Sequence, residues 1–393
     1  MKLQNKMDSI AKFKIPEPIQ KERTPFYYYD LDLLNHTLAT AKKEADKYNF
    51  IIHYAVKANA NDRILKIIRH HGIDADCVSG NEIKKVIEIG FDPEGIVYAG
   101  VGKTDWEIEL AMETNIFCFN CESIAEIKVI NSLAGKAGKT VNIALRINPN
   151  FRAGAHEYIT TGVEENKFGI HPGELEIIMD TLALCPNLKF VGLHFHIGSQ
   201  ITDLNTFKRL CIRVNQIQEW FHNHQIIVNH INVGGGFGVD YNDPDNHPVS
   251  DFPNYFKLFN RFLDIGPGQK VHFELGRSLV AQCGSLITKV LYIKKGINTK
   301  FAIVDAGMTD LIRPALYQAY HKIENFTSTG KQEYYTIVGP ICESSDTFGK
   351  YILLPETNRN DLLCIRSAGA YGETMASRYN LRDLPRALYS DNL

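Results

Sequence analysis

The stretch that decides the fold is His53-Tyr54-Ala55-Val56-Lys57-Ala58-Asn59-Ala60-Asn61, in which an apolar run that begins at Ile51 ends on a single lysine. Such a run is typical of a buried strand in a parallel sheet. A lysine at its end lies where the core stops and a ligand cavity can begin. Burial lowers the pKa of a lysine, and the neutral amine can then attack a carbonyl to form a Schiff base. The alternative is a lysine whose stem lies along the core while its amine stays in water.

Strand-like and helix-like segments alternate outward from this lysine. The strand-like runs are 51–56, 72–78, 96–98, 116–119, 141–147, 188–196, 230–233 and 270–274. The segments with helical periodicity between them are 62–70, 81–89, 106–113, 123–133, 173–184, 204–224 and 255–263. This alternation predicts an α/β fold, specifically a (β/α)₈ TIM-like barrel.

The pattern changes after Arg277. Strand-like runs then follow one another without a strong helical repeat, at 279–294, 301–305, 334–338, 351–354 and 361–367. We expect a β-rich C-terminal domain, a β-sandwich or a β-barrel, which the N-terminal strand 26–29 can join. The predicted division is a barrel domain at 30–277 and a β-rich domain made of 1–29 and 278–393.

Composition excludes several classes of function. The chain has 393 residues, 22% charged residues and a formal net charge of −2, which does not indicate binding to nucleic acid. Residues 1–23 lack the apolar core of a signal peptide, and no apolar run has membrane-spanning length. We therefore expect a cytoplasmic protein without a membrane segment. The eight cysteines are scattered, which predicts reduced and mostly buried thiols.

Close pairs of cysteine or histidine do not predict a metal site. Cys118 and Cys121 have C-x-x-C spacing, but a second pair is missing. We expect His194 and His196 to point to opposite faces of one strand, which would prevent them from sharing a metal ion.

The unusual residues of the barrel region fall at the predicted C-terminal ends of its strands, where the chemistry of such barrels is located. They are Lys57, Asp76 with Ser79, Arg146, His196 with Gly198-Ser199, Gly234-Gly235-Gly236, and Glu274 with Gly276-Arg277. Together they indicate one cavity for a cofactor that carries an aldehyde and a phosphate.

Each part of such a cofactor has a candidate partner. The loop 234–238 lets backbone N–H groups approach a phosphate, and Arg277 and Ser199 are further donors. Glu274 offers a carboxylate for a protonated pyridine nitrogen, which makes the ring an electron sink. The alternative for Glu274 is a surface carboxylate. His196 is either a ring that stacks on the cofactor or a hydrogen-bonded core histidine.

These residues resemble the fold type III pyridoxal-phosphate-dependent amino-acid decarboxylases, and within them the branch that acts on diaminopimelate. The resemblance extends from about Thr24 to Asn380. Its motifs are Tyr54-Ala55-Val56-Lys57-Ala58-Asn59, Asn166-Lys167-Phe168-Gly169, His196-Ile197-Gly198-Ser199-Gln200, Gly234-Gly235-Gly236-Phe237-Gly238, Glu274-Leu275-Gly276-Arg277, Cys342-Glu343-Ser344 and Ala368-Gly369-Ala370-Tyr371. The family usually has proline where Leu275 stands and glycine where Ser345 stands. We expect the first difference to affect loop rigidity and the second to alter the turn that places Cys342 and Glu343.

The resemblance implies pyridoxal 5'-phosphate as cofactor and decarboxylation of meso-2,6-diaminopimelate to L-lysine and CO₂. It implies two catalytic residues, Lys57 as the Schiff-base residue and Cys342 as the proton donor; the alternative for Cys342 is an inert buried thiol. The implied cofactor-binding residues are Lys57, Asp76, His196, Ser199, Gly234, Gly235, Gly236, Glu274, Gly276, Arg277 and Tyr371. The implied substrate-binding residues are Arg277, Arg313, Tyr317, Glu343 and Tyr371.

The resemblance also implies a homodimer with shared active sites, in which the β-rich domain contributes to a partner's substrate site and to the interface. A distal carboxylate of the substrate would pair with Arg313, whose alternative is a surface arginine. Two other functions stay open. One is a related basic amino-acid decarboxylase or a racemase on the same scaffold. The other is a catalytically silent homologue that acts in binding or regulation.

Overall fold

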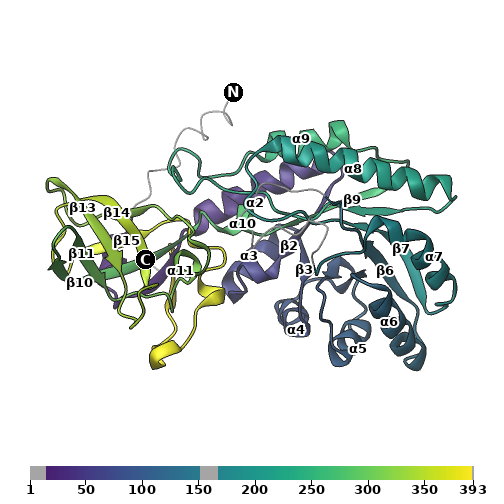
Figure 1. Cartoon of the computed structure of the whole chain (residues 1–393), viewed down its shortest axis with the longest axis horizontal. Coiled ribbons are helices and arrows are strands. Elements are labelled where there is room, and N and C mark those ends of the chain that lie inside the picture. The colour runs from purple at the N-terminus through teal and green to yellow at the C-terminus, as the bar shows by residue number, and fades with distance from the viewer. Residues whose placement is uncertain (1–14, 151–166, 392–393) are drawn as a thin grey trace. The chain divides into compact units, whose positions relative to one another are not determined.

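The computed structural model describes residues 15–150 and 167–391 (Figure 1). The chain divides into two compact units. We call them the barrel unit, Leu38–Gly238 with Asp251–Gly276, and the sheet unit, Met1–Thr37 with Val239–Ser250 and Arg277–Leu393. The predicted domain limits at residues 30 and 277 stay a prediction. Residues 1–14, which belong to the segment analysed for a signal peptide, and Asn166 of the Asn-Lys-Phe-Gly motif lie outside the described residues.

The barrel unit contains a closed barrel of eight parallel strands, as predicted. These are β2 (Ile51–Ala55), β3 (Asp74–Cys77), β4 (Ile96–Tyr98), β5 (Cys118–Cys121), β6 (Val141–Arg146), β7 (Leu188–His194), β8 (His230–Asn232) and β9 (Lys270–Leu275). The barrel closes where β2 pairs with β9, with Tyr54 opposite Leu275. Leu275 is therefore a fully buried strand residue, and its departure from the family's usual proline falls inside the ladder.

Helices follow the barrel strands around the outside (Figure 1). They are α3 (Asp62–His70), α4 (Gly80–Ile89), α5 (Asp105–Glu113), α6 (Ile124–Lys136), α7 (Leu175–Ala183), α8 (Leu204–Asn223) and α9 (Phe252–Phe262). Aromatic packing joins this layer to the barrel, since Phe273 of β9 lies 5.0 Å from Phe256 and 4.9 Å from Phe259 between ring centroids. Ser79 has a structural task here, because its Oγ accepts the Glu82 N–H and caps α4.

The sheet unit is β-rich, as predicted. It holds an eight-stranded sheet of β1 (Phe26–Tyr29), β10 (Gly284–Lys295), β11 (Lys300–Val304), β12 (Ile323–Asn325), β13 (Gln332–Val338), β14 (Thr347–Pro355), β15 (Leu362–Ile365) and β16 (Arg386–Tyr389). The N-terminal strand joins this sheet, antiparallel to β10 and parallel to β16. The remaining helices are α1 (Glu17–Gln20), α2 (Leu31–Asp46), α10 (Arg277–Val280) and α11 (Arg313–Tyr317).

Some boundaries differ from the prediction. Strand β5 begins at Cys118 rather than at Ile116, because the Phe117 N–H bonds to the loop carbonyl of Pro93 and to Ile96. The prediction missed β12 and β16, since three or four residues are too few to show a strand period. Among the described residues, no helix is long and apolar enough to cross a membrane.

Candidate active site

Lys57 lies in a short 3₁₀ turn, Val56–Ala58, directly after β2. Its Nζ donates to Asp76 Oδ2 of β3 at 3.2 Å. The Lys57 side chain is 39% exposed, whereas that of Asp76 is fully buried. The amine therefore lies at the barrel edge and not deep in the core, which differs from the buried lysine that we expected. Asp76 supplies it with a fixed acceptor.

Glu274 of β9 lies inside the barrel among three donors. Asn120 Nδ2 and Asn232 Nδ2 donate to its Oε1 at 3.2 and 2.7 Å, and His194 Nε2 lies 3.0 Å from its Oε2. Glu274 is only 5% exposed, which excludes the surface-carboxylate alternative. A carboxylate accepts about four hydrogen bonds, so about one position remains open.

The pKa values of the two buried carboxyl groups, Glu274 and Asp76, are shifted in opposite directions. Burial would raise the pKa of Glu274, but the His194 ring and Lys57 outweigh burial and hold that pKa below its usual range. Burial raises the pKa of Asp76, and the charge of Glu274 raises it further, while Lys57 opposes both effects. Glu274 is thus the carboxylate that stays ionised in this barrel.

His196 follows β7, which ends at His194. Burial, together with the charges of Arg146 and Lys57, lowers the pKa of His196 to about 3, so the ring is neutral near pH 7. The expected opposite orientation of His194 and His196 on one strand is wrong, because β7 ends at His194 and His196 lies beyond it. Alternation along a strand places residues two apart on the same face. Within the described residues, no cluster of His, Cys, Asp or Glu has metal-binding geometry.

The glycine loop packs backbone against backbone. A Cβ on Gly234 would lie 2.2 Å from the Phe195 carbonyl oxygen, and one on Gly235 would lie 1.8 Å from the Glu274 carbonyl oxygen. Gly234 also has a φ of +72°. The Gly235 N–H donates to His196 Nδ1 at 3.3 Å. The loop therefore joins the ends of β7, β8 and β9, and larger residues are excluded there.

Two of the loop's amides are already used within the barrel. Gly235 N donates to His196, and Gly234 N donates to Asn232 Oδ1 at 2.9 Å. Among the described residues, no hydrogen bond engages the N–H groups of Gly236 and Phe237. An anion in this loop would therefore depend on those two amides.

Other predicted strand-end residues have structural partners. Arg146 forms a buried ion pair with Glu122 at 2.5 Å, and Glu122 also accepts the Gly169 N–H at 2.9 Å. This arrangement anchors the segment after β6 that begins at Lys167. Ser199 is partly exposed in the loop after β7, and Gly276 is buried between β9 and α10.

Arg277 and Arg313 meet at a tyrosine that the sequence analysis missed. Arg277 Nη1 lies 2.6 Å from Tyr241 Oη, and Arg313 Nη1 lies 3.0 Å from the same oxygen. Both arginines are 6% exposed, so the surface alternative for Arg313 is wrong. Arg277 also lies over the Tyr371 ring, 4.8 Å from its centroid. Tyr317 ends α11 and is partly exposed.

Arg313 has a further neighbour, His321. Its Nη1 donates to His321 Nε2 at 2.8 Å, while His321 Nδ1 lies 2.9 Å from the Arg366 carbonyl. The carbonyl can only accept, so His321 carries its proton on Nδ1 and is neutral. Within the described parts of the chain, no carboxylate lies within 4 Å of Arg313. A buried cation without a counter-charge is costly and is suited to an incoming carboxylate.

Cys342 and Glu343 lie on an exposed loop of the sheet unit, so the buried-thiol alternative for Cys342 is wrong. The ends of this loop are held by Asp346, which accepts the N–H groups of Met308 and Ile341 at 2.6 and 2.7 Å. Ser345 does not require the family's usual glycine, because its φ is not positive. Its Oγ instead donates to Glu343 Oε2 at 3.3 Å.

The predicted site residues thus form two groups, each within one unit. The barrel unit brings together Lys57, Asp76, His196, Gly234, Gly235, Gly236 and Glu274. The sheet unit brings together Arg277, Arg313 and Tyr371, and it carries Tyr317, Cys342 and Glu343.

Four residues that contact predicted site residues were not predicted from the sequence: Asn120, Asn232, Tyr241 and His321. Only Asn232 carried a local signal, since it precedes the glycine loop at the end of a predicted strand. The other three have no motif of their own. Cys118 and Cys121 flank Asn120 and are buried, and burial raises the pKa of both thiols, which favours a packing role.

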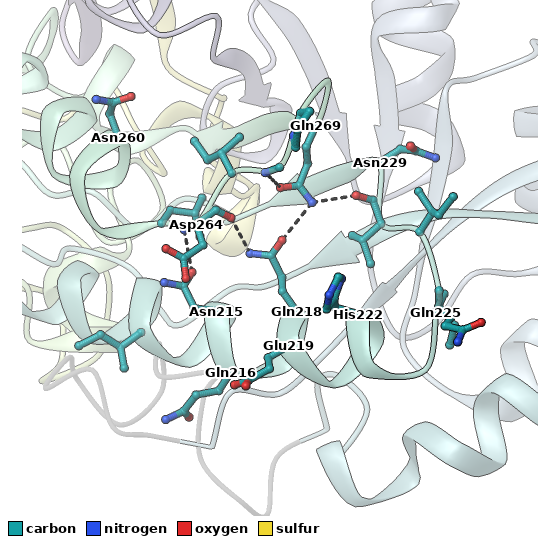
Figure 2. Close-up of a pocket in the computed structure, with 18 residues that line it drawn as sticks. Asn215, Gln216, Gln218, Glu219, His222, Gln225, Asn229, Asn260, Asp264 and Gln269 are labelled. Carbon is teal, nitrogen blue, oxygen red and sulfur yellow. Dashed lines mark hydrogen bonds between the residues drawn. The ribbon is translucent and has the colours of Figure 1, made fainter.

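A separate cavity of about 1310 Å³ lies between α8, α9 and the loops that precede β8 and β9 (Figure 2). Its position at the N-terminal ends of these strands is opposite to the strand ends that carry Glu274 and the glycine loop. Figure 2 shows Gln218 and Gln269 bonded to each other, and Gln269 also donates to the Val228 carbonyl. These amides already serve to join α8 to the loops, and no predicted site residue lines the cavity.

Comparison with known proteins places this geometry in a family. Residues 31–281 match the model described as "Pyridoxal-dependent decarboxylase, pyridoxal binding domain". The diaminopimelate decarboxylase of Bacteroides thetaiotaomicron is 56% identical over 380 residues, which covers 96% of this chain and 98% of that protein. The chain belongs to the diaminopimelate decarboxylase family.

A second family member is the diaminopimelate decarboxylase of Helicobacter pylori strain J99, which is 41% identical over 94% of this chain and 91% of that protein. The crystal structure of the Helicobacter pylori enzyme complexed with L-lysine superposes with a TM-score of 0.90 at 40% identity, covering 96% of this chain and 94% of that one. Diaminopimelate decarboxylases are pyridoxal-phosphate-dependent carbon–carbon lyases, so the chain has the fold and chemistry of that class.

The barrel unit of this family member fits a pyridoxal ring. Lys57 offers an amine, Glu274 has about one acceptor position left, and Asp76 Oδ1 is buried without a hydrogen-bond partner among the described residues. His194 Nδ1 is likewise buried and without a partner there. Buried polar atoms in this state are rare in folded proteins and suit a site that a polar ligand completes.

Proposed function

We propose that this chain decarboxylates meso-2,6-diaminopimelate to L-lysine and CO₂ with pyridoxal 5'-phosphate, as a cytoplasmic homodimer. The observation that carries the proposal is that one barrel holds both the Lys57 amine, which bonds to Asp76, and a buried, ionised Glu274. A binding protein without activity has no use for a carboxylate held ionised at that burial cost.

Bound pyridoxal 5'-phosphate supplies an aldehyde for an amine and a ring that accepts the electron pair left when CO₂ departs. Lys57 would hold the aldehyde through its Nζ, and Asp76, which accepts from that amine, would orient it. Glu274 stays ionised and so can hold a proton on a pyridine nitrogen. The neutral His196 ring would offer the cofactor a flat, uncharged surface. The amides of Gly236 and Phe237 would hold its phosphate, with Ser199, Gly276 and Arg277 as further contacts.

The distal end of the substrate needs a cation for its carboxylate and an acceptor for its amine. Arg313 is buried and has no carboxylate partner among the described residues, and Arg277 lies beside it at Tyr241. We assign the distal carboxylate to Arg277, Arg313 and Tyr317, and the distal amine to Glu343. Tyr371 completes this set, because its ring lies against Arg277.

A proton must replace the departing carboxylate at the substrate carbon. We assign this transfer to Cys342, whose exposed position on an anchored loop leaves the thiol accessible. In the proposed dimer this loop of one chain serves the barrel of its partner. A racemase on the same scaffold would release no CO₂, which separates the two activities.

The test compares CO₂ release from diaminopimelate, lysine, ornithine and arginine, with Arg313→Ala beside the wild type. Because lysine and ornithine offer no carboxylate at the far end, they leave Arg313 without its partner and should react at least about a hundredfold more slowly. Arg313→Ala should remove most of that preference. A wild type that prefers ornithine or arginine, or an Arg313→Ala variant with unchanged preference, contradicts this assignment.

A further inference from the structure

Tyr241 occupies an unusual position for a buried tyrosine. Its side chain is 7% exposed, and its oxygen lies 2.6 Å from Arg277 Nη1 and 3.0 Å from Arg313 Nη1. Both guanidinium groups can only donate. Among the described residues, no group accepts a hydrogen bond from the Tyr241 hydroxyl. The oxygen thus receives two charged donors, while its own proton has no acceptor.

We infer that Tyr241 is a positioning residue that holds Arg277 and Arg313 side by side as a pair that binds one carboxylate. This inference rests on the proposed function and adds a residue to which no site role had been assigned. Two like charges close together repel, and a shared oxygen between them offsets that repulsion. A tyrosine does so without the full negative charge of an aspartate or glutamate at neutral pH. Both arginines are therefore oriented, and Arg313 has no carboxylate partner among the described residues.

The surroundings of Arg313 support this assignment. His321, its other partner, is neutral, because its pKa is lowered to about 3 by burial and by Arg313 itself. The Tyr241 ring also packs edge-on against the His321 ring at 5.1 Å between centroids. This ring contact positions both Tyr241 and His321, the two residues that bond to Arg313. Both are uncharged in this arrangement, so neither neutralises the charge of Arg313.

The electrostatics agree with the geometry. Burial alone would raise the pKa of Tyr241, but the charges and hydrogen bonds of Arg277 and Arg313 outweigh burial and lower it below its ordinary value. The phenol consequently gains negative charge more easily than a tyrosine in water. An anion bound to Arg277 and Arg313 should therefore change the pKa of the Tyr241 hydroxyl.

The experiment uses holoenzyme and two inhibitors that differ by one carboxylate, L-lysine and cadaverine. L-Lysine, bound as the reaction product, keeps the carboxylate of the distal end of diaminopimelate. Cadaverine lacks that carboxylate. Tyr241→Phe keeps the ring but removes the shared oxygen. We expect the inhibition constant of L-lysine and the KM of diaminopimelate to rise about tenfold or more. We expect kcat to change less than about threefold and the inhibition constant of cadaverine to stay the same. Neither quantity depends on binding of the distal carboxylate.

A second measurement does not depend on turnover. The near-ultraviolet difference spectrum between wild type and Tyr241→Phe, recorded against pH, should show one of the 18 tyrosines ionising below pH 10. Tyr334→Phe, which removes an exposed tyrosine, is the matched control and should not remove that transition. If Tyr241→Phe fails to fold, Tyr241→Gln supplies an acceptor that cannot ionise and serves in its place.

The outcomes separate the inference from the proposed function. Equal weakening of L-lysine and cadaverine would show a general structural role and overturn the inference, as would unchanged L-lysine affinity or the absence of an early tyrosine transition. If the wild type does not distinguish L-lysine from cadaverine, the proposed distal carboxylate site fails. In that case the tyrosine transition still tests the contact of Tyr241 with the arginines.

Discussion

Asn232 Nδ2 donates a 2.7 Å hydrogen bond to Glu274 Oε1, while Asn232 Oδ1 accepts the Gly234 N–H at 2.9 Å. One buried amide therefore connects the carboxylate proposed for the pyridine nitrogen with the loop proposed for the phosphate. These two ends of the proposed cofactor site are held in a single geometry by Asn232.

Asn232→Ala should weaken cofactor binding. The substitution leaves both Glu274 and the Gly234 N–H short of one partner in the interior, which costs about 1–3 kcal/mol. We expect about tenfold weaker binding of pyridoxal 5'-phosphate in an absorbance titration, with lower thermal stability. Asn215→Ala is the matched control, since Asn215 also bonds at both ends, to Phe262 and Asp264, beside the separate cavity. It should reduce stability and leave cofactor affinity unchanged; equal cofactor affinity in both variants would contradict the linking role.

Borohydride reduction followed by peptide mapping should place the cofactor on Lys57. The barrel unit contains a buried lysine for comparison, Lys103, whose side chain is 1% exposed. Lys103 is held by Glu126 and by the carbonyls of Gly100 and Asn120, so its amine is not available to an aldehyde. Lys57→Ala should lose the label and the activity. A label on Lys103 or on any other lysine would refute the assignment.

Mixing two inactive variants tests the proposed shared sites. Lys57→Ala and Cys342→Ala chains should be inactive alone. After random exchange half of the dimers are mixed, and each has one complete site, so roughly a quarter of wild-type activity should return. Lys57→Ala mixed with the double variant Lys57→Ala/Cys342→Ala offers no complete site and is the control. No recovery, despite demonstrated exchange, would mean that each chain builds its own site.

Three histidines form a hydrogen-bonded chain within the barrel. His53 Nδ1 lies 3.0 Å from the Gly95 carbonyl, His53 Nε2 lies 2.9 Å from His272 Nδ1, and His272 Nε2 lies 2.9 Å from His230 Nδ1. The Gly95 carbonyl can only accept, so His53 carries a proton on Nδ1; when all three rings are neutral, each donates from Nδ1 in the same direction. Burial lowers the pKa of each ring, which favours the neutral form of all three.

The free energy of unfolding should decrease as the pH falls below about 6.5, the ordinary pKa of histidine. In the unfolded chain these histidines bind protons below about pH 6.5, whereas the folded barrel resists protonation, so acid favours unfolding. Each neutral histidine contributes a slope of about 1.4 kcal/mol per pH unit below that point. The free energy of unfolding can be measured with urea between pH 6.5 and 5. In His272→Gln its slope against pH should be smaller by about that amount. His224 is exposed and is not one of the three hydrogen-bonded histidines, so His224→Gln should keep the wild-type slope. An unchanged slope in His272→Gln would contradict a neutral His272.

Local sequence was sufficient for the architecture. Strand and helix periods repeat within five to twenty residues, and burial patterns are visible over that range, which is why β2, α3 and β9 were predicted within one residue of their observed ends. The barrel rule then placed Lys57, His196 and Glu274 at strand ends without knowledge of any contact. The short strands of the sheet unit were missed, because three or four residues carry no clear period.

The sequence by itself determined the barrel, the β-rich unit and the positions of Lys57 and Glu274 at strand ends, because those features follow from short-range patterns. Only the tertiary structure decided their partners. Asn120 reaches Glu274 across 154 positions, and Tyr241 reaches Arg313 across 72. Hydrogen bonds of this kind form when barrel closure or sheet packing brings distant side chains within about 3 Å. No local period encodes such a pair, so the charge state of Glu274 and the shared oxygen of Tyr241 had to be seen in the folded chain.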